Sequence, residues 1–333
     1  MQTDPTAKSD AVIVTSDAVI VTSDADIVTS DAVFAPLPQF GLLAVTGDDA
    51  RAFLHAQLSN DVQNLPAQTA RRAGYCSPKG RLLASLLVIA RSDGFLLQVS
   101  GDIAAAIAKR LSMYVLRSKV RVVDGATTWS QFGVWGRGSA ALLQAAGFLL
   151  PNASMQAAQS QAGIVIGQGV ERFLVIAPPQ TAAALAARMP EVAADAWMLA
   201  EVREGLPLIT LPTQDQFVPQ MANFELIGGI DFKKGCYPGQ EVVARAQYRG
   251  QVKRRMFRGE VDAPGTIVPV AGQDLFGSEP QAIGTIVTVA SRPGGGYELL
   301  AVIQSSSVEQ GDGIRVGTPD GPAARITPLH YAA

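Results

Sequence analysis

A cysteine among basic residues is the group in this sequence whose surroundings best suit chemistry. Cys236 lies in residues 231–250, which read DFKKGCYPGQEVVARAQYRG. The basic residues of this stretch are Lys233, Lys234, Arg245 and Arg249. Nearby cations and a helix N-terminus lower the pKa of a thiol and favour its reactive thiolate form. Pro238 suits the first position of a helix, so the sequence predicts a helix from there, with Gln240 and Glu241 in its first turn.

The residues alone leave a structural interpretation of Cys236 equally open. Most lone cysteines are small buried residues, and Gly235 and Gly239 fit a tight turn around one. No histidine lies near Cys236 in the sequence, which weighs against the cysteine–histidine pair of a hydrolase. On these grounds the reactive and the structural interpretations are evenly matched.

A second group of basic residues extends from residue 245 to residue 258. It consists of Arg245, Arg249, Lys253, Arg254, Arg255 and Arg258, interleaved with Tyr248 and Phe257. This density, in a chain of net charge −2, favours a site for the phosphates of RNA or the carboxylates of a small ligand. The alternative is a solvated edge between a helix and a strand.

Aromatic residues make up only 6% of the chain, so the positions of a few of them are informative. Phe40, Trp197 and Tyr237 are candidates to stack on a flat ligand. Each of them could equally serve the hydrophobic core, which is the more common role of an aromatic side chain.

Composition limits the remaining classes of function. The two cysteines and two histidines, Cys76, Cys236, His55 and His330, form no zinc or iron–sulfur ligand pattern, so we expect no permanently bound metal. The longest apolar run, residues 82–90 interrupted by Ser85, is far shorter than the ~20 residues of a membrane span. The acidic N-terminus resembles no export signal. We therefore expect a cytoplasmic protein without a membrane partner.

The chain divides into a repetitive start and three ordered parts. Residues 9–34 repeat the unit SDAVIVT, and we expect residues 1–36 to be a disordered tail. Alternating apolar residues predict strands at 42–45, 81–90, 95–99 and 120–123, and helical spacing predicts helices at 48–58 and 103–116. A small α+β unit follows, with strands at 131–134, 164–166 and 172–176 and helices at 139–146 and 181–189.

The later part of the chain contains a helix, a long loop and a run of strands. We expect a helix at 195–204, closed by Gly205 and Pro207. Residues 206–229 lack periodicity, and a loop of that length is usually functional or disordered. Strands at 254–261, 284–290 and 297–304 predict a small barrel-like β domain over residues 251–333.

Several blocks of this sequence resemble one known family. GGIDFKKGCYPGQEVVARAQYRGQVKRR is similar to the signature of the YgfZ family, folate-binding proteins of iron–sulfur cluster maintenance that are related to the T-protein (aminomethyltransferase) of glycine cleavage. GLLAVTGDDARAFLHAQLSNDV, CSPKGRLLASLLV, RSKVRVVD and VREGLPLI resemble other parts of the family. The resemblance covers nearly everything from Leu37 onward. The KGCYxGQE core is its most specific part.

The resemblance implies an α+β fold in which three domains form a ring of the T-protein type, with a C-terminal β-barrel domain. Residues 37–130 and 191–250 would form a discontinuous folate-binding core, residues 131–190 the small α+β domain, and residues 251–333 the barrel. Tetrahydrofolate or a derivative would bind in a central pocket. The implied functional residues are Cys236, Lys234, Gln240 and Glu241, and the implied folate contacts are Phe40, Trp197, Tyr237, Arg245 and Arg249.

Two departures from the related sequences bear on function. Phe40 stands where the family has a tryptophan, which keeps a stacking face and loses the indole N–H. Ala84 and Ser85 stand where the T-protein has a pair of aspartates, so methylene transfer loses its expected proton-handling group. The leading hypothesis is therefore a folate-binding auxiliary protein that supports assembly or repair of [4Fe–4S] enzymes, including those that modify tRNA. Its expected partners are iron–sulfur enzymes or cluster carriers. The alternatives are a folate-dependent one-carbon transferase and, less favoured, direct tRNA binding.

Overall fold

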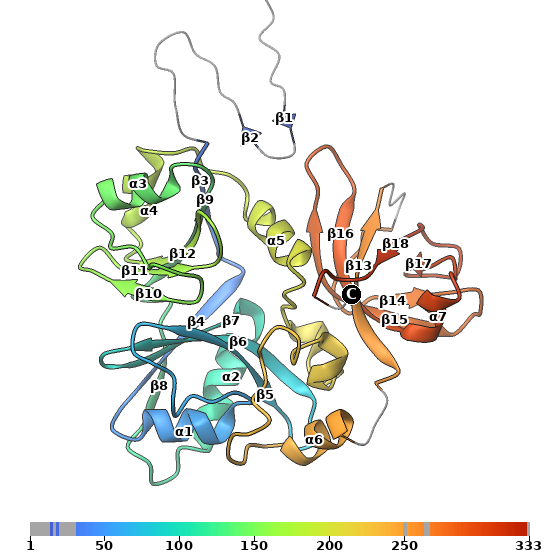
Figure 1. The fold of residues 1–333 in the computed structure, drawn as a ribbon, viewed down its shortest axis with the longest axis horizontal. Coiled ribbons are helices and arrows are strands. Elements are labelled where there is room, and N and C mark those ends of the chain that lie inside the picture. Colours follow the sequence, from blue (N-terminus) through green and yellow to red (C-terminus); the bar gives the residue numbers. More distant parts are fainter. Residues whose placement is uncertain (1–13, 16–17, 20–30, 249–251, 263–266, 332–333) are drawn as a thin grey trace, which may run out of the picture.

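The computed structural model describes residues 14–15, 18–19, 31–248, 252–262 and 267–331. Figure 1 shows three lobes around a common centre, and each lobe is built on an antiparallel sheet. Two short strands, β1 (Val14–Thr15) and β2 (Ala18–Val19), pair with each other ahead of the lobes. The rest of the expected tail before Asp31 lies outside the described residues.

The first lobe contains a sheet whose two faces are both buried. Its strand order is β5 (Ala70–Cys76), β6 (Leu82–Arg91), β7 (Gly94–Ser100), β4 (Phe40–Thr46) and β8 (Arg121–Asp124). Along β6, Leu86 and Val88 belong to the core beneath α1 (Ala50–Gln57) and α2 (Gly101–Met113). Leu87 and Ile89 belong to the core at the centre of the molecule. This period of two explains the nearly continuous apolar sequence of β6.

The second lobe repeats this arrangement on a smaller scale. Its strand order is β10 (Ala157–Gln159), β11 (Ile164–Gly167), β12 (Arg172–Ala177), β9 (Ser130–Trp135) and β3 (Val33–Pro36). Helices α3 (Ser139–Ala145) and α4 (Thr181–Ala186) cover one face. Strand β3 corrects the expected start of ordered sequence at Leu37, because Phe34 is fully buried in this sheet.

The third lobe is a six-stranded sheet curled into a half-barrel. Its order is β17 (Arg315–Val316), β14 (Asp274–Phe276), β15 (Ala282–Ser291), β16 (Tyr297–Gln304), β13 (Arg254–Val261) and β18 (Arg325–Thr327), with α7 (Ser305–Glu309) after β16. Register shifts in β14 and β15 accompany the curl. Among the described residues, no ladder joins β17 to β18. Across all the residues that the structure describes, no helix is long and apolar enough to cross a bilayer.

Helix α5 (Ala194–Arg203) connects the second and third lobes (Figure 1). Trp197 of α5 presses against the backbone of Gly133 on β9. From the same helix, the Arg203 guanidinium donates to the carboxylate of Glu298 on β16, at 3.0 Å from Nε and 2.8 Å from Nη2. The central hydrophobic cluster takes its members from α5 and from one face of each sheet. The three lobes therefore share one core at the centre.

The long aperiodic segment after α5 is an ordered connection between lobes. It contains two short 3₁₀ helices, η1 (Leu211–Thr213) and η2 (Pro219–Ala222), and ends before α6 (Gln240–Tyr248). The Leu82 N–H donates to the Phe217 carbonyl at 2.8 Å, and the Asn223 amide donates to the Met256 carbonyl of the third lobe at 2.9 Å. These hydrogen bonds hold the segment in one conformation, which its aperiodic sequence does not indicate.

The contact of Gly133 with Trp197 gives a test of the shared core. A methyl group added at Gly133 would lie 2.2 Å from Cε3 of Trp197, so the indole must move. We expect Gly133→Ala to lower the free energy of unfolding by about 1–3 kcal/mol in urea denaturation. Gly313→Ala is the control, because no atom lies within 4 Å of its added methyl group. Equal stability of the two variants would contradict this packing.

Candidate functional site

Cys236 lies on an exposed loop before α6, whereas Cys76 is buried at the end of β5. Helix α6 confirms the predicted helix with Gln240 and Glu241 in its first turn, but it begins at Gln240 and not at Pro238. The reason is Gly239, which adopts a left-handed backbone with φ of +78° and separates the proline from the helix. Cys236 is consequently outside the first turn of α6, and the helix N-terminus is not its direct neighbour.

The turn of residues 76–80 supports this loop. The Ser77 N–H donates to the Arg81 carbonyl at 2.8 Å, which closes the hairpin turn between β5 and β6. Gly239 packs so tightly on it that an added methyl group would lie 2.4 Å from the Ser77 carbonyl oxygen. Burial raises the pKa of the Cys76 thiol to about 12, which makes Cys76 inert below the loop.

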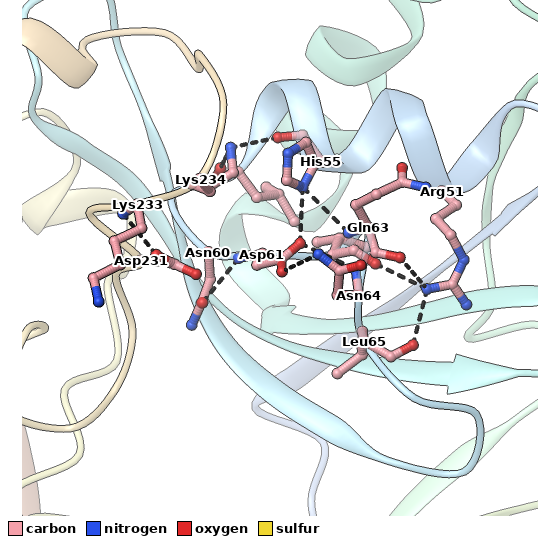
Figure 2. A network of polar contacts seen from close by, with 12 residues as sticks. Arg51, His55, Asn60, Asp61, Gln63, Asn64, Leu65, Asp231, Lys233 and Lys234 are labelled. Atoms are coloured by element: carbon pink, nitrogen blue, oxygen red, sulfur yellow. Dashed lines mark hydrogen bonds and ion pairs between the residues drawn. The ribbon is translucent and has the colours of Figure 1, made fainter.

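Lys234 attaches the loop to the end of α1. Its Nζ donates to the carbonyl oxygens of His55 at 2.6 Å and Leu58 at 3.0 Å, as Figure 2 shows for His55. Nζ also lies 4.8 Å from the ring centroid of Tyr237. Burial lowers the pKa of Lys234 to about 8, and the charges of Asp61, Asp231 and Cys236 oppose that shift. Lys234 is therefore first of all an anchor at the negative end of a helix.

The side chain of His55 lies on the same side of α1 as the loop, within a polar network (Figure 2). His55 Nδ1 lies 3.1 Å from Oδ1 of Asp61 and accepts from the Gln63 N–H at 3.2 Å. Its Nε2 would lie 3.5 Å from a methyl group added at Gly235, next to Cys236. The fold thus brings the His55 ring close to Gly235 of the motif.

The other residues of the motif have different surroundings. Tyr237 is buried, and burial raises its pKa. The Gln240 amide donates to the Lys234 carbonyl at 3.4 Å. Glu241 and Arg245 are exposed to solvent and lie 3.8 Å apart as a pair along α6. Arg249 lies outside the described residues.

A cavity at the junction of the lobes brings Phe40 and Trp197 together. Its other walls include Leu87 and Leu174, one from each of the first two sheets, and Phe224 of the long segment. Its polar lining consists of Arg72, Ser85, Gln98, Gln168 and Glu201. The described lining contains none of Tyr237, Arg245 or Cys236, so those residues do not share this cavity with the two aromatic rings.

The indole of Trp197 is held in place on several sides. The guanidinium carbon of Arg172 lies 4.1 Å from its ring centroid, and Trp135 meets it edge-on at 5.7 Å. Arg172 donates in turn to Glu201 of α5 and to Glu204, the residue that follows the helix, each at 2.6 Å. Because Arg172 covers one face of the indole, Trp197 serves as a fixed wall of the cavity as well as a candidate ligand contact.

Arg72 brings a partly buried positive charge to the cavity, and among the described residues no carboxylate forms an ion pair with it. Its Nη1 donates to Sδ of Met155 at 3.1 Å and its Nη2 to Oε1 of Gln168 at 3.3 Å. Burial lowers its pKa, while the charges of Glu201 and Glu204 oppose this. Buried charges are normally paired, so a guanidinium with neutral acceptors suits an oxo or carboxylate group of a ligand. The sequence does not single out Arg72, because Arg71, Arg72 and Gly74 interrupt the apolar pattern by which strand β5 could be predicted.

Ala84 and Ser85 point to opposite faces of β6. Ala84 belongs to the core beneath the helices. Ser85 faces the cavity, where its hydroxyl accepts from the Ile209 N–H at 2.9 Å.

The basic run from residue 245 to residue 258 does not form one cationic cluster among the described residues. Arg255 pairs with Glu225, and Arg258 lies 3.3 Å from Glu260. Glu225 comes from the long segment before the motif, whereas Glu260 lies two residues after Arg258 on β13.

The lowered pKa of Lys234 predicts a pH dependence. Between about pH 8, its pKa in the folded chain, and 10.5, its ordinary value, the unfolded chain holds more protons at this side chain. The contribution of Lys234 to the free energy of unfolding therefore rises as pH rises through this window. We expect the difference in free energy of unfolding, wild type minus Lys234→Met, to increase from about pH 7.5 to about pH 10 in urea denaturation. The exposed neighbour provides the control, Lys233→Met. A difference that stays constant or falls would contradict the burial of the amine.

Comparisons with known proteins agree with this architecture. Residues 15–170 match the family model described as GCVT N-terminal domain. The tRNA-modifying protein YgfZ of Edwardsiella ictaluri is 32% identical over 303 residues, which cover 86% of this chain and 89% of that protein.

Two solved structures are similar to this chain to different degrees. The glycine cleavage system aminomethyltransferase T from Bartonella henselae has a TM-score of 0.74 at 19% identity, over 91% of this chain and 86% of its own. Heterotetrameric sarcosine oxidase from Corynebacterium sp. U-96 reaches only 0.35 at 16% identity, over 46% of this chain and 79% of its own, which is too low to bear on the fold. The first structure confirms the α+β fold of the T-protein type. With the sequence identity above, the chain belongs to the YgfZ family.

Proposed function

We propose that this chain is a cytoplasmic protein that binds a reduced folate in the central cavity and supports assembly or repair of [4Fe–4S] enzymes through Cys236. Its clients would include enzymes that modify tRNA, in keeping with the name of the Edwardsiella relative. The observation that carries the proposal is a cavity that combines two aromatic rings with an arginine whose side-chain acceptors, among the described residues, are neutral.

The lining of the cavity suits the chemistry of folate. A pterin is flat and apolar on its faces, and its edge carries amino, ring N–H and oxo groups. Phe40 offers a ring for stacking, while Gln98 and Gln168 offer acceptors for the pterin donors. Arg72 offers donors to an oxo group or to a carboxylate of the glutamate tail. Apolar walls with a few converging polar groups are typical of cofactor sites.

The position of Cys236 suits a macromolecular client better than a ligand in the cavity. The thiol is exposed and lies outside the cavity, on a loop held by Lys234. Thiolates are the usual protein ligands of iron in iron–sulfur clusters, so an exposed one can reach iron held by another protein. The expected partners are therefore iron–sulfur enzymes or cluster carriers. The absence of a disulfide between the two cysteines fits a reducing compartment.

One-carbon transfer is the less favoured alternative. It needs a group beside the folate that accepts or donates a proton. The Ser85 hydroxyl is engaged by the Ile209 N–H, and the Glu201 carboxylate is engaged by Arg172. Direct binding of tRNA is also less favoured, because carboxylates pair with Arg255 and Arg258.

The role of Cys236 can be tested by restoring tRNA thiolation in a strain that lacks its own YgfZ-family protein. Wild-type chain should restore the thiolated nucleoside made by a [4Fe–4S] enzyme, quantified by mass spectrometry of digested tRNA. Cys236→Ala should leave the level of the empty strain, because no thiolate remains on the loop. Cys76→Ala, at a buried and inert position, serves as the control and should restore it. Full restoration by Cys236→Ala would refute the proposed role of the thiol.

A further inference from the structure

Gln98 is a polar residue on an otherwise apolar part of the central face of the first sheet. On β7 it lies opposite Leu42 of β4 and Leu87 of β6, and both leucines belong to the central hydrophobic core. Leu96, two residues earlier on β7, belongs to the same core. Gln98 is half-buried and lines the central cavity. An amide in such surroundings is costly unless its polar atoms have partners, so the partners of this amide indicate its role.

A chain of two hydrogen bonds fixes the orientation of the Gln98 amide. Nε2 of Gln131 donates to the Phe40 carbonyl at 2.9 Å. Since a carbonyl oxygen can only accept, the nitrogen of the Gln131 amide must be on this side and its oxygen on the other. That oxygen accepts from Nε2 of Gln98 at 2.8 Å. The buried Gln131 thus engages the nitrogen of the Gln98 amide and leaves its Oε1 for another donor.

The oxygen of Gln98 differs in this respect from two other polar groups of the cavity. Oε1 of Gln168 accepts from Nη2 of Arg72 at 3.3 Å, and the Ser85 hydroxyl accepts from the Ile209 N–H at 2.9 Å. Among the described residues, no donor lies within hydrogen-bond distance of Oε1 of Gln98. This atom is also absent from the buried polar atoms that lack a partner, so it keeps accessible surface. The cavity therefore contains an acceptor that is fixed in orientation and uncommitted.

We propose that Gln98 makes the cavity selective for an amino-substituted ring, because its Oε1 accepts a hydrogen bond from the 2-amino group of the pterin. The inference rests on the proposed function in taking a folate as the ligand. The amino group suits this acceptor better than the neighbouring ring N–H, which adjoins the 4-oxo group and its lone pairs. A ring with an oxo group at position 2 would place two acceptors against each other and leave both without a donor. Gln131 acts as a positioning residue.

The same hydrogen bond joins the first lobe to the second, since Gln98 lies on β7 and Gln131 on β9. If joining the lobes were its whole role, the two glutamines would be equivalent, because replacing either one breaks the bond. The proposed role makes them unequal. Gln98 carries the acceptor that meets the ligand, whereas Gln131 only orients it.

Calorimetric titration of wild type, Gln98→Met and Gln131→Met with 5-formyltetrahydrofolate separates the two roles. Methionine keeps the length of the side chain and removes the amide. Gln98→Met should bind about 10-fold more weakly, because the amino group of the ligand then meets a thioether, a weak acceptor. Gln131→Met should bind about 2- to 3-fold more weakly, since the Gln98 oxygen remains and loses only its fixed orientation. An equal loss in the two variants, or no loss in Gln98→Met, overturns the inference.

The choice between an amino and an oxo group is tested with two competitors of 5-formyltetrahydrofolate, folic acid and its 2-deamino-2-oxo analogue. Wild type should prefer folic acid by about 10-fold or more, and Gln98→Met should lose this preference. Altered packing of the lobes would weaken both competitors alike and leave their ratio unchanged. If Gln98→Met does not fold, as judged by far-UV circular dichroism, Gln98→Asn replaces it with the same expectation, because its side chain is shorter by one methylene.

The outcomes separate this inference from the proposed function. Wild type without a preference for folic acid, or a preference that survives the substitution of Gln98, overturns the inference and leaves folate binding intact. No binding of 5-formyltetrahydrofolate to wild type would overturn both.

Discussion

The packing of Trp197 between Gly133 and the Arg172 guanidinium is the constraint on which the arrangement of the lobes depends. Arg172 is buried on β12, and its charge is balanced by two carboxylates, Glu201 of α5 and Glu204 directly after it; α5 also carries Trp197. Removing one partner of a buried ion pair typically costs about 3–5 kcal/mol, because the other charge stays desolvated. Since Arg203 of the same helix binds the buried Glu298, one helix holds the second and third lobes in a fixed relation. The walls of the central cavity follow from that relation.

The central cavity and the motif loop are two separate chemical environments, and strand β5 extends from one to the other. On β5, Arg72 reaches the cavity, while Cys76 lies buried at the end of the strand beneath the motif loop. Cys76 and the buried Tyr237 of the motif both belong to the central hydrophobic cluster. A ligand in the cavity and a thiol on the surface thus share a rigid support. The proposed function assigns the cavity to a folate and the exposed thiol to a client protein.

The sequence predicts the regular parts of this molecule well and the irregular parts poorly. The apolar alternation at 81–90 and 297–304 corresponds to β6 and β16 within a residue or so. Strand β5 escapes notice because Arg71, Arg72 and Gly74 interrupt its apolar pattern. Phe40 and Trp197 do meet in one cavity, but the motif and the cavity are separate, which spacing along the chain could not indicate. The contact of His55 with Gly235 joins distant segments, and only the folded chain reveals it.

The central claim is that the junction of the lobes is a folate site in which Arg72 supplies the charge. Calorimetric titration of wild type, Arg72→Met and Arg71→Met with 5-formyltetrahydrofolate, a stable reduced folate, tests it most directly. Arg71 is the matched control. As the neighbour of Arg72 on β5, it belongs to the opposite face of the strand, and it donates to the Asp61 carbonyl at 2.5 Å. The account predicts that Arg72→Met binds about 10-fold or more weakly, the loss expected for one hydrogen bond to a charged group. Arg71→Met should bind as wild type does. Equal affinity of all three proteins, or no binding to wild type, would contradict it.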